Sequence, residues 1–357
     1  FWLVKTDRFG DMEWNRTFDC DNDNLDDEGN SVKQTRDNGF ILTGFSNHSV
    51  RKKDVVAIKT NEIGKIDNEE TTFLKVFNDF ELTIDDTNTN LTNQNQRGYS
   101  VIQSSNGNYV ITGYTYIKPK VGIYTLKDEL IVINLSSNGI TNDILYYPNE
   151  PITVDNNDEY GRFIEEIPDE GYIITGITNN TDDNTQGDYW LLKLDKNFNH
   201  IWNKTWDYRE SIDKARSLYQ ISGGGFVIVG WANDSDQDDI WMIKTDSSGE
   251  NHKNYIFQKE GQETANQIIQ SRDRGLVIIG STSLLNNQDL WLIKTNSSGE
   301  MLWNRTYGSK GDDRGWSIQQ TRDGGYAITG YYEKANRWAV WLLKTDSYGN
   351  ITQSNQN

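Results

Sequence analysis

The residues of this chain whose spacing suits metal binding are carboxylates in one short acidic segment. Between Asp19 and Glu28, aspartates stand at or near alternate positions, namely Asp19, Asp21, Asp23 and Asp26. Oxygen ligands with this spacing in a loop suit Ca²⁺, which prefers several hard oxygen donors. The segment is not a full EF-hand pattern, because Asn24 replaces the usual glycine and the twelfth position is Asn30. A solvated acidic loop is the default interpretation, calcium binding is the alternative, and no other cofactor is expected.

Other residue types give little support for catalysis. Cys20 is the only cysteine, so no internal disulfide can form. His48, His200 and His252 are far apart in sequence and form no zinc or haem motif. No Gly-x-Ser-x-Gly sequence indicates a serine nucleophile. A glycosidase would need a pair of carboxylates, but spacing singles out no pair among the 53 Asp and Glu residues, so we expect no enzyme activity.

Asn-x-Ser/Thr sequons, which can accept N-linked glycans in secreted proteins, are frequent. Asn15, Asn203 and Asn304 belong to a repeated strand sequence that explains them without glycosylation. The better acceptors lie in predicted loops, at Asn47, Asn90, Asn179 and Asn233.

The composition excludes several classes of protein. The 357 residues include 53 Asp plus Glu against 35 Lys plus Arg, for a formal net charge of −18. We expect no nucleic-acid partner, because binding nucleic acid requires a basic surface. An aromatic content of 12% argues against a disordered acidic tail. No apolar run reaches the length of about 18 residues that a membrane span needs.

A repeated segment dominates the sequence. Its clearest copy runs from Ser317 to Gly330 and reads SIQQTRDGGYAITG. The six copies end on a glycine, at Gly44, Gly113, Gly176, Gly230, Gly280 and Gly330. The last three glycines are 50 residues apart, and the earlier ones are more widely spaced. A fixed period of about 50 residues indicates a repeat architecture.

A second segment alternates with the first. Its copy from Trp291 to Gly299 reads WLIKTNSSG, and a short run follows it from Trp303 to Thr306. These runs are short, rich in Ile, Val, Tyr, Trp and Thr, and bounded by Asp, Asn, Ser and Gly, as is typical of β-strands joined by tight turns. Because the first segment holds two strands and a turn, each repeat is predicted to hold four strands.

Four antiparallel strands in each repeat predict an all-β fold, a β-propeller of four-stranded antiparallel blades, with residues 1–357 as a single domain. The recurring tryptophans are expected to pack between blades, at Trp2, Trp190, Trp241, Trp291 and Trp341. The lysine three residues after each tryptophan, as at Lys5 and Lys294, either bridges to an acidic residue of the next blade or is a solvated strand end.

The number of blades depends on how the N-terminal residues are interpreted. The first segment occurs six times and the second seven times, because the chain opens on a copy of the second. The preferred interpretation is seven blades with one incomplete in this chain, through a missing upstream strand pair or overlapping chain ends. The alternative is six blades plus an extra hairpin, which could pair with a neighbouring molecule by strand addition.

Three insertions break the period, at residues 61–97, 114–127 and 146–159. Two of them place aromatic and charged residues in predicted loops, at Lys118, Pro119, Lys120, Tyr146 and Tyr147. Because loops on a rigid scaffold often carry binding surfaces, these five residues are a predicted interface with another subunit or a glycan. A tolerated surface insertion is the alternative.

The sequences from Trp303 to Gly308, from Ser317 to Tyr326 and from Trp341 to Asp346 resemble a repeat family of secreted propellers. Proteins of that family are archaeal and bacterial cell-surface or extracellular proteins, largely uncharacterised. The resemblance is weaker in the first repeats, where Val56 and Ile131 replace the usual tryptophan and Asn134 replaces the usual lysine. It implies a propeller fold and an extracellular or cell-surface location, and it assigns no catalytic residue.

The sequence therefore predicts a non-enzymatic structural or adhesive surface protein. Its expected partners are copies of itself, in a filament or lattice, with glycans or other surface proteins as further candidates. A glycan-binding or carbohydrate-active propeller is the alternative.

Overall fold

The fold consists of β-strands, and the described residues contain no helix that could cross a membrane. The computed structural model describes residues 1–20, 27–49, 52–67, 71–77, 82–83, 90–91, 95–117, 127–147, 159–168, 171–179, 187–234, 237–284, 287–334 and 337–355. They form two compact units. Unit 1 comprises Phe1–Thr6, Met12–Gln186 and Trp190–Thr205, and unit 2 comprises Asp7–Asp11, Gly187–Tyr189 and Trp206–Asn357.

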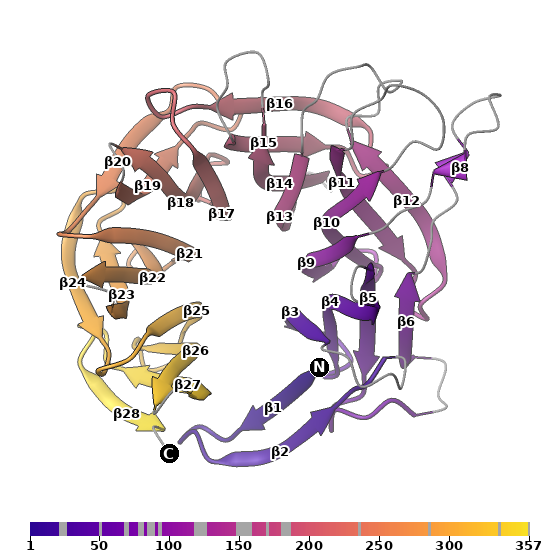
Figure 1. Cartoon of the computed structure of the whole chain (residues 1–357), viewed down its shortest axis with the longest axis horizontal. Helices are drawn as coiled ribbons and strands as arrows, with labels where there is room; N and C mark the ends of the chain where they lie inside the picture. Colours follow the sequence, from indigo (N-terminus) through magenta and orange to yellow (C-terminus); the bar gives the residue numbers. More distant parts are fainter. Residues whose placement is uncertain are drawn as a thin grey trace. The chain divides into compact units, whose positions relative to one another are not determined.

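Unit 1 begins with a two-stranded hairpin, β1 (Trp2–Thr6) and β2 (Met12–Thr17), and continues with three blades (Figure 1). Blade 1 contains β3 (Glu28–Gln34), β4 (Phe40–Ser49), β5 (Lys52–Thr60) and β6 (Phe73–Phe77). A separate short pair, β7 (Leu82–Thr83) and β8 (Asn90–Leu91), follows it. Blade 2 contains β9 (Gln96–Gln103), β10 (Tyr109–Ile117), β11 (Lys127–Leu135) and β12 (Thr141–Tyr147). Blade 3 contains β13 (Glu159–Ile167), β14 (Gly171–Thr178), β15 (Asp188–Leu194) and β16 (His200–Trp206). The first two residues of β15 and the last residue of β16 belong to unit 2.

Unit 2 contains the other three blades (Figure 1). Blade 4 contains β17 (Asp213–Gln220), β18 (Phe226–Asp234), β19 (Gln237–Lys244) and β20 (Lys253–Phe257). Blade 5 contains β21 (Gln262–Gln270), β22 (Leu276–Leu284), β23 (Asn287–Thr295) and β24 (Met301–Tyr307). Blade 6 contains β25 (Asp313–Gln320), β26 (Tyr326–Lys334), β27 (Arg337–Thr345) and β28 (Ile351–Asn355).

The prediction of an all-β propeller with four-stranded antiparallel blades is confirmed. The described strands make six complete blades, each with its strands hydrogen-bonded in chain order. The two-stranded β1–β2 sheet is additional to them. Six blades plus an extra hairpin, the second of the two interpretations of the repeat count, therefore fits the chain.

The glycine that ends each copy of the first segment has a steric role. Within blade 5, Gly280 pairs with Ala265 next to a β-bulge of β21. A Cβ atom at Gly280 would lie 1.8 Å from the carbonyl oxygen of Thr264, and at Gly330 it would lie 1.8 Å from that of Arg314. No side chain fits so close to a backbone oxygen, so each bulge requires glycine on the facing strand.

The turn between the first two strands of a blade is built by local hydrogen bonds. In blade 6, the Gly324 N–H donates to the Thr321 carbonyl oxygen, and the Gly325 N–H donates to the Asp323 side chain. Gly324 has φ +88°, which glycine and asparagine tolerate best. Asn38, with φ +65°, takes the equivalent position in blade 1.

Tryptophans of complete blades pack between neighbouring blades, as predicted. Within unit 2, Trp291 of blade 5 is buried in a cluster with Ile240 and Met242 of blade 4, and Trp341 of blade 6 is buried with Leu290 of blade 5. Trp2 in the N-terminal hairpin is the exception, because 55% of its surface is exposed.

Three of the recurring lysines of the third strand bind acidic residues of their own blade, whereas Lys244 of β19 donates to the Ser297 carbonyl oxygen of the next blade over 2.7 Å. Lys59 of β5 contacts Asp37, Lys294 of β23 contacts Asp273, and Lys344 of β27 contacts Asp323. These aspartates lie in the turns between the first and second strands. The third strand pairs with the second strand, so its lysine lies beside the turn of its own blade.

Candidate functional site

Each blade of unit 2 begins with a buried carboxylate that holds the preceding loop. Asp213, Glu263 and Asp313 all lie two residues before the small residue at the β-bulge, and all are fully buried. The Tyr208 N–H donates to Asp213 over 2.6 Å, and the Lys259 N–H donates to Glu263 over 3.0 Å. The Ser309 N–H donates to Asp313 in the same way. These bonds satisfy loop backbone donors that have no strand partner.

A second carboxylate recurs at the start of the third strand, two residues before the tryptophan. It is Asp188 in β15, Asp239 in β19 and Asp289 in β23. In blade 5, Gly308 approaches this carboxylate so closely that a Cβ atom there would lie 2.0 Å from an oxygen of Asp289. In blade 3 the corresponding residue, the first after the fourth strand, is Asp207. Asp207 is thus a third carboxylate near Asp188 and Asp213.

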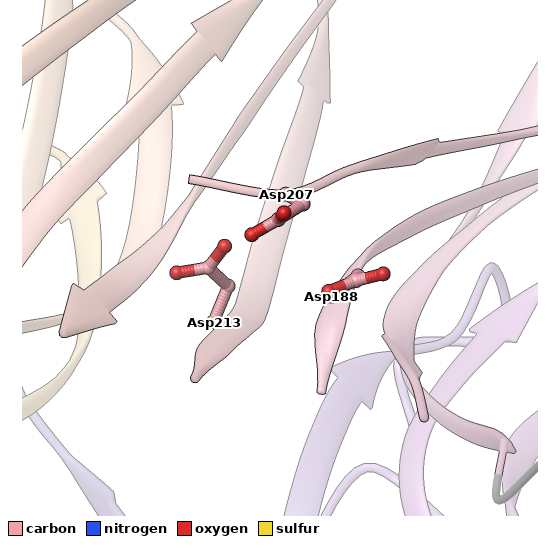
Figure 2. Close-up of side chains that lie close together, drawn as sticks. All are labelled: Asp188, Asp207 and Asp213. Carbon is pink, nitrogen blue, oxygen red and sulfur yellow. The ribbon is translucent and has the colours of Figure 1, made fainter. Parts of the chain in front are cut away.

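The resulting cluster of Asp188, Asp207 and Asp213 lies within unit 2 (Figure 2). One oxygen from each side chain lies within 4.8 Å of the others. Asp188 and Asp213 are buried, whereas Asp207 is exposed. A backbone hydrogen bond holds Asp213 beside the residue that precedes Asp188, because the Asp213 N–H donates to the Gly187 carbonyl oxygen over 2.6 Å. We call these three residues the carboxylate cluster.

The electrostatics of the carboxylate cluster favour a bound proton. Burial raises the pKa of Asp213 to about 8, with repulsion from Asp207 and Asp188 adding to the rise. Hydrogen bonds from Tyr208 N and from the Ser211 hydroxyl, the latter 3.0 Å from Asp213 Oδ1, oppose the rise without cancelling it. Asp213 is therefore mostly protonated at neutral pH.

Two kinds of chemistry are open to such a cluster. Three carboxylates within reach of one another match the hard oxygen ligands of a divalent cation, and a protonated carboxyl beside an ionised one can transfer a proton. However, both oxygens of Asp213 already accept hydrogen bonds from the loop, and Glu263 and Asp313 bind their loops in the same way without a third carboxylate at the described position. The role that these contacts assign to Asp213 is structural.

A different site arises from the incomplete repeat at the N-terminus. Strands β1 and β2 carry the sequence of the third and fourth strands of a blade, and Trp2 corresponds to Trp291. Trp2 is 55% exposed, whereas Trp291 is 1% exposed. Among the described residues, β1 pairs with β2 alone, and its other edge, which in blade 5 would bind a second strand, has no partner. We call β1 and β2 the N-terminal hairpin.

Lys5 completes the description of the N-terminal hairpin. Its counterparts Lys59 and Lys294 are buried and contact turn aspartates. The side chain of Lys5 is 43% exposed and contacts Glu13 of β2 instead. Glu13 lies on β2, so Lys5 contacts a neighbouring strand where Lys59 and Lys294 contact a turn aspartate.

Blade 1 also has a surface that is buried in the other blades. Val32 in β3 is 48% exposed, whereas the corresponding Val101 in β9 is 0% exposed. Val101 packs against Ile41 in the second strand of the preceding blade. Phe1 and Leu3 of the N-terminal hairpin pack against another part of blade 1, with Leu42, Val56 and Ile58.

The predicted calcium loop is described only at its start. Asp19 is exposed, and the Cys20 N–H donates to Asp27 over 3.1 Å. Asp21, Asp23 and Asp26 lie outside the described residues.

All four favoured sequons fall in or beside strands, so their predicted placement in loops was wrong. Asn47 lies in β4 and Asn233 in β18, and Asn179 directly follows β14; these three residues are half-buried. The Asn233 amide donates to Asp238 over 2.8 Å, across the hairpin between β18 and β19. Asn90 lies in β8, and its side chain is outside the described residues.

The predicted interface residues lie in different surroundings. Tyr146 is half-buried, while Tyr147 is buried in the core of unit 1, where its hydroxyl donates to the Phe198 carbonyl oxygen. Tyr147 is thus a packing residue and offers no surface for a partner. Lys118, Pro119 and Lys120 lie outside the described residues.

Sequence reasoning missed the carboxylate cluster, although a signal for it is present. An Asp or Glu stands two residues before the tryptophan-type position in blades 1 to 5, as at Asp54, Glu129, Asp188, Asp239 and Asp289. Aligning the repeats would also place Asp207 where Gln258 and Gly308 stand. This alignment identifies Asp207 as the feature that distinguishes blade 3.

Comparison with known proteins supports the fold. No family model matches the chain, and no curated protein matches its sequence. A protein of unknown function from Dyadobacter fermentans superposes with a TM-score of 0.55 at 11% identity, over 88% of this chain and 93% of that one. An ulvan lyase of a new polysaccharide lyase family superposes with a TM-score of 0.53 at 6% identity, over 88% of this chain and 78% of that one. At such identities the chain is similar to these proteins in fold alone.

Proposed function

We propose that this protein is a non-enzymatic structural or adhesive protein of the cell surface or extracellular space, which assembles with other polypeptides through its N-terminal hairpin. The observation that carries the proposal is the exposure of Trp2 at a position that is buried in complete blades. An exposed aromatic beside a strand edge favours association when, as for Trp2 and β1 among the described residues, neither the apolar surface nor the backbone donors of that edge have a strand partner.

The proposed location is supported by two features of the sequence. The repeats resemble those of secreted archaeal and bacterial propellers, and sequons occur at Asn47, Asn90, Asn179 and Asn233. Mass spectrometry of peptides from the native protein tests the second feature. Attached glycans on these asparagines are expected, and unmodified peptides at all four positions would argue against an N-glycosylated surface protein.

Assembly can be measured directly on the purified chain. Light scattering after size exclusion, together with electron micrographs, should show species larger than one chain, with copies of the chain as the partner. Trp2→Ser should shift them towards the monomer, because it removes the exposed ring from the N-terminal hairpin. Tyr348→Ser is the matched control, since Tyr348 is an exposed aromatic in the turn before β28. A chain that stays monomeric at high concentration would refute self-assembly.

A second candidate function is glycan binding, which an aromatic group in blade 6 favours. The exposed rings of Trp316 and Trp338 flank Tyr331, with centroid distances of 6.3 and 4.7 Å to it. Grouped exposed aromatics are a common feature of ligand-binding surfaces. A glycan array tests this function: binding that Trp338→Ala removes would support it, and absence of binding across the array would exclude it for the glycans presented.

A further inference from the structure

Blades 2 and 3 carry arginine and tyrosine side chains at positions where blade 5 carries small polar residues. We infer that these side chains bind an acidic glycan, that is, a saccharide bearing carboxylate or sulfate groups. This deepens the second candidate function, glycan binding, and rests on residues other than the aromatic group of blade 6. The residues are Arg97, Tyr99 and Tyr114 of blade 2 and Tyr160 and Arg162 of blade 3, all in unit 1, and we call them the arginine–tyrosine cluster.

Blade 5 shows that the repeat does not need large side chains at these positions. Thr264 of β21 stands opposite Ser281 of β22, and their hydroxyl oxygens are hydrogen-bonded over 2.9 Å. At the bulge, the Asn266 amide donates to the Gly315 carbonyl oxygen over 2.7 Å. The residues at these three positions in blade 2 are Arg97, Tyr114 and Tyr99. Because small residues complete the same backbone arrangement by themselves, packing alone does not explain the arginines and tyrosines.

The arginine–tyrosine cluster brings a cation into contact with several aromatic rings. Strands β9 and β10 of blade 2 contact β13 of blade 3 (Figure 1). The guanidinium carbon of Arg162 lies 4.1 Å from the ring centroid of Tyr99 and 5.8 Å from that of Tyr160. The ring of Tyr114 stacks on Tyr99 at a centroid distance of 5.8 Å and meets the edge of Tyr160 at 5.0 Å. Every residue of the cluster is half-buried, so part of each side chain faces solvent.

The two arginines lack an anionic partner. Among the described residues, neither Arg97 nor Arg162 forms an ion pair or a side-chain hydrogen bond, and the Nε atom of each is shielded from solvent without an acceptor. The neighbouring carboxylate of Asp128 accepts the Tyr160 hydroxyl over 2.5 Å. Shielded donors without acceptors are unfavourable, and charged donors especially so. A bound anion would satisfy both guanidinium groups.

Positive charge is also concentrated around Arg97. The guanidinium carbon of Arg97 and the ammonium group of Lys53 lie 4.7 and 4.3 Å from the ring centroid of Phe45. Burial lowers the pKa of Lys53, and repulsion from Arg97 lowers it further, while attraction by Glu28 opposes the fall. Cations placed this close to each other in a chain of net charge −18 indicate a local preference for an anion.

The hydroxyl of Tyr114 adds an uncharged donor to the two arginines. Burial raises the pKa of Tyr114 to about 12, and the positive charges of Arg97 and Arg162 both oppose that rise. Tyr114 therefore keeps its proton at neutral pH, and both arginines lie near enough to act on the same hydroxyl. Two guanidinium groups and one hydroxyl can thus donate hydrogen bonds to a single bound group.

An acidic glycan combines the two kinds of contact that the cluster offers. The planar guanidinium group binds carboxylate or sulfate oxygens through paired hydrogen bonds. The tyrosine rings present flat apolar surfaces on which the C–H face of a sugar ring can stack. An acidic peptide would supply the carboxylates without the sugar ring, so the tyrosines favour the glycan.

Labelled tetrasaccharides test the inference on the purified 357-residue chain by fluorescence anisotropy. The probes are a galacturonan tetrasaccharide with carboxylates, a carrageenan tetrasaccharide with sulfates, and neutral cellotetraose. At least one acidic probe should bind saturably and more weakly as salt rises, and the probe that binds identifies the anionic group. The inference would be overturned if neither acidic probe bound, if cellotetraose bound as tightly, or if a poly-glutamate peptide matched the acidic glycan.

Substitutions test the residues. Arg97→Gln and Arg162→Gln should each weaken binding of the acidic probe about 10-fold, since each removes a charged donor. Arg162→Lys keeps the charge but loses the planar pair of donors, so it should recover only part of the affinity. Arg16→Gln is the matched control, because Arg16 is a half-buried arginine of β2 in unit 1 that lies over the Trp14 ring at 5.3 Å.

A milder variant guards against loss of folding. Tyr114→Phe keeps the ring and removes only the donor hydroxyl, so it should weaken binding about 5-fold while the urea midpoint confirms an intact fold. Unchanged affinity in Arg97→Gln, Arg162→Gln and Tyr114→Phe would overturn the inference.

The outcomes separate this inference from the proposed functions. Glycan binding that Trp338→Ala removes and the arginine variants leave unchanged supports the aromatic group of blade 6 and refutes the arginine–tyrosine cluster. A chain that forms high-mass species but binds no acidic probe keeps the assembly role and refutes the inference. A monomeric chain that binds an acidic probe through Arg97 and Arg162 supports the inference and refutes self-assembly.

Discussion

The ammonium group of Lys59 lies 2.7 Å from a carboxylate oxygen of Asp37, and the lysine side chain is entirely buried while that of Asp37 remains half exposed. Replacing Asp37 by alanine would leave a buried cation without its counter-ion. Because uncompensated buried charges are strongly unfavourable, Asp37→Ala should lower the free energy of unfolding by about 3 kcal/mol. Urea denaturation followed by tryptophan fluorescence measures the loss.

The control for the ion pair between Lys59 and Asp37 removes the charge of the buried lysine instead. Lys59→Met keeps most of the side-chain volume and leaves Asp37 partly exposed to water, so it should cost less than Asp37→Ala. A larger loss of unfolding free energy for Lys59→Met than for Asp37→Ala would contradict this explanation. It would mean that Lys59 stabilises the fold mainly by donating to the Thr60 carbonyl oxygen, 2.8 Å away, and not through Asp37.

Glycine at the bulge of each blade should be irreplaceable. Gly280→Ala would place a methyl group 1.8 Å from the Thr264 carbonyl oxygen, so the two strands would have to separate. We expect a loss of about 3 kcal/mol in the free energy of unfolding, at the upper end of overpacking effects. Gly324→Asn is the control, because its turn is open and Asn38 takes that conformation in blade 1. Its cost should stay below about 1 kcal/mol; similar losses for both variants would contradict the steric explanation.

These glycines also show why so much of the fold could be predicted from sequence. A bulge, a positive φ angle and a two-residue alternation each demand particular residue types, and the demand recurs in every blade. Gly280 and Gly330 therefore mark the middle of each second strand, opposite its bulge, and the Asp-x-Gly turns mark where the first strand ends. The tryptophan positions were predicted for the same reason, since one interblade pocket is built repeatedly from Ile, Val and Leu.

The candidate sites were harder to predict because they depend on departures from the repeat. Asp188, Asp207 and Asp213 come from the ends of three strands, and only their spatial approach makes them a cluster. Trp2 matches the repeat in sequence but is 55% exposed, because among the described strands β1 pairs with β2 alone. An ion pair to the next blade, one of the two alternatives for the recurring lysines, was wrong for Lys59, Lys294 and Lys344, because sequence spacing cannot distinguish a turn of the same blade from the adjacent blade.

The difference between Trp2 and Trp291 predicts a difference in stability. Trp291→Ser should lower the free energy of unfolding by about 4 kcal/mol, because it empties a buried site and removes the indole N–H that donates to Asn304 over 3.1 Å. Trp2→Ser should cost less than about 1 kcal/mol, because the ring is mostly exposed. Urea midpoints of the two variants check the contrast. Equal losses would mean that Trp2 is buried in solution.

The raised pKa of Asp213 predicts that stability falls as pH rises. In the folded chain Asp213 keeps its proton up to a pKa of about 8, whereas in the unfolded chain it loses the proton near the ordinary value of 3.8. The folded state thus holds the extra proton between these two pH values. The stabilisation is complete below the lower value and is lost as pH rises towards 8, by at most about 1.4 kcal/mol per pH unit.

The measurement is a series of urea midpoints from pH 5 to pH 8.5, in which Asp213→Asn should show a smaller decline than the unaltered chain. Some decline should remain, because burial also raises the pKa values of Asp289 and Asp313. Asp207→Asn provides the matched control: it removes a repelling charge from an exposed neighbour, so the pKa of Asp213 should fall and the decline should end at a lower pH. An unaltered decline in Asp213→Asn would mean that Asp213 is ionised throughout this range and that its loop contacts outweigh its burial.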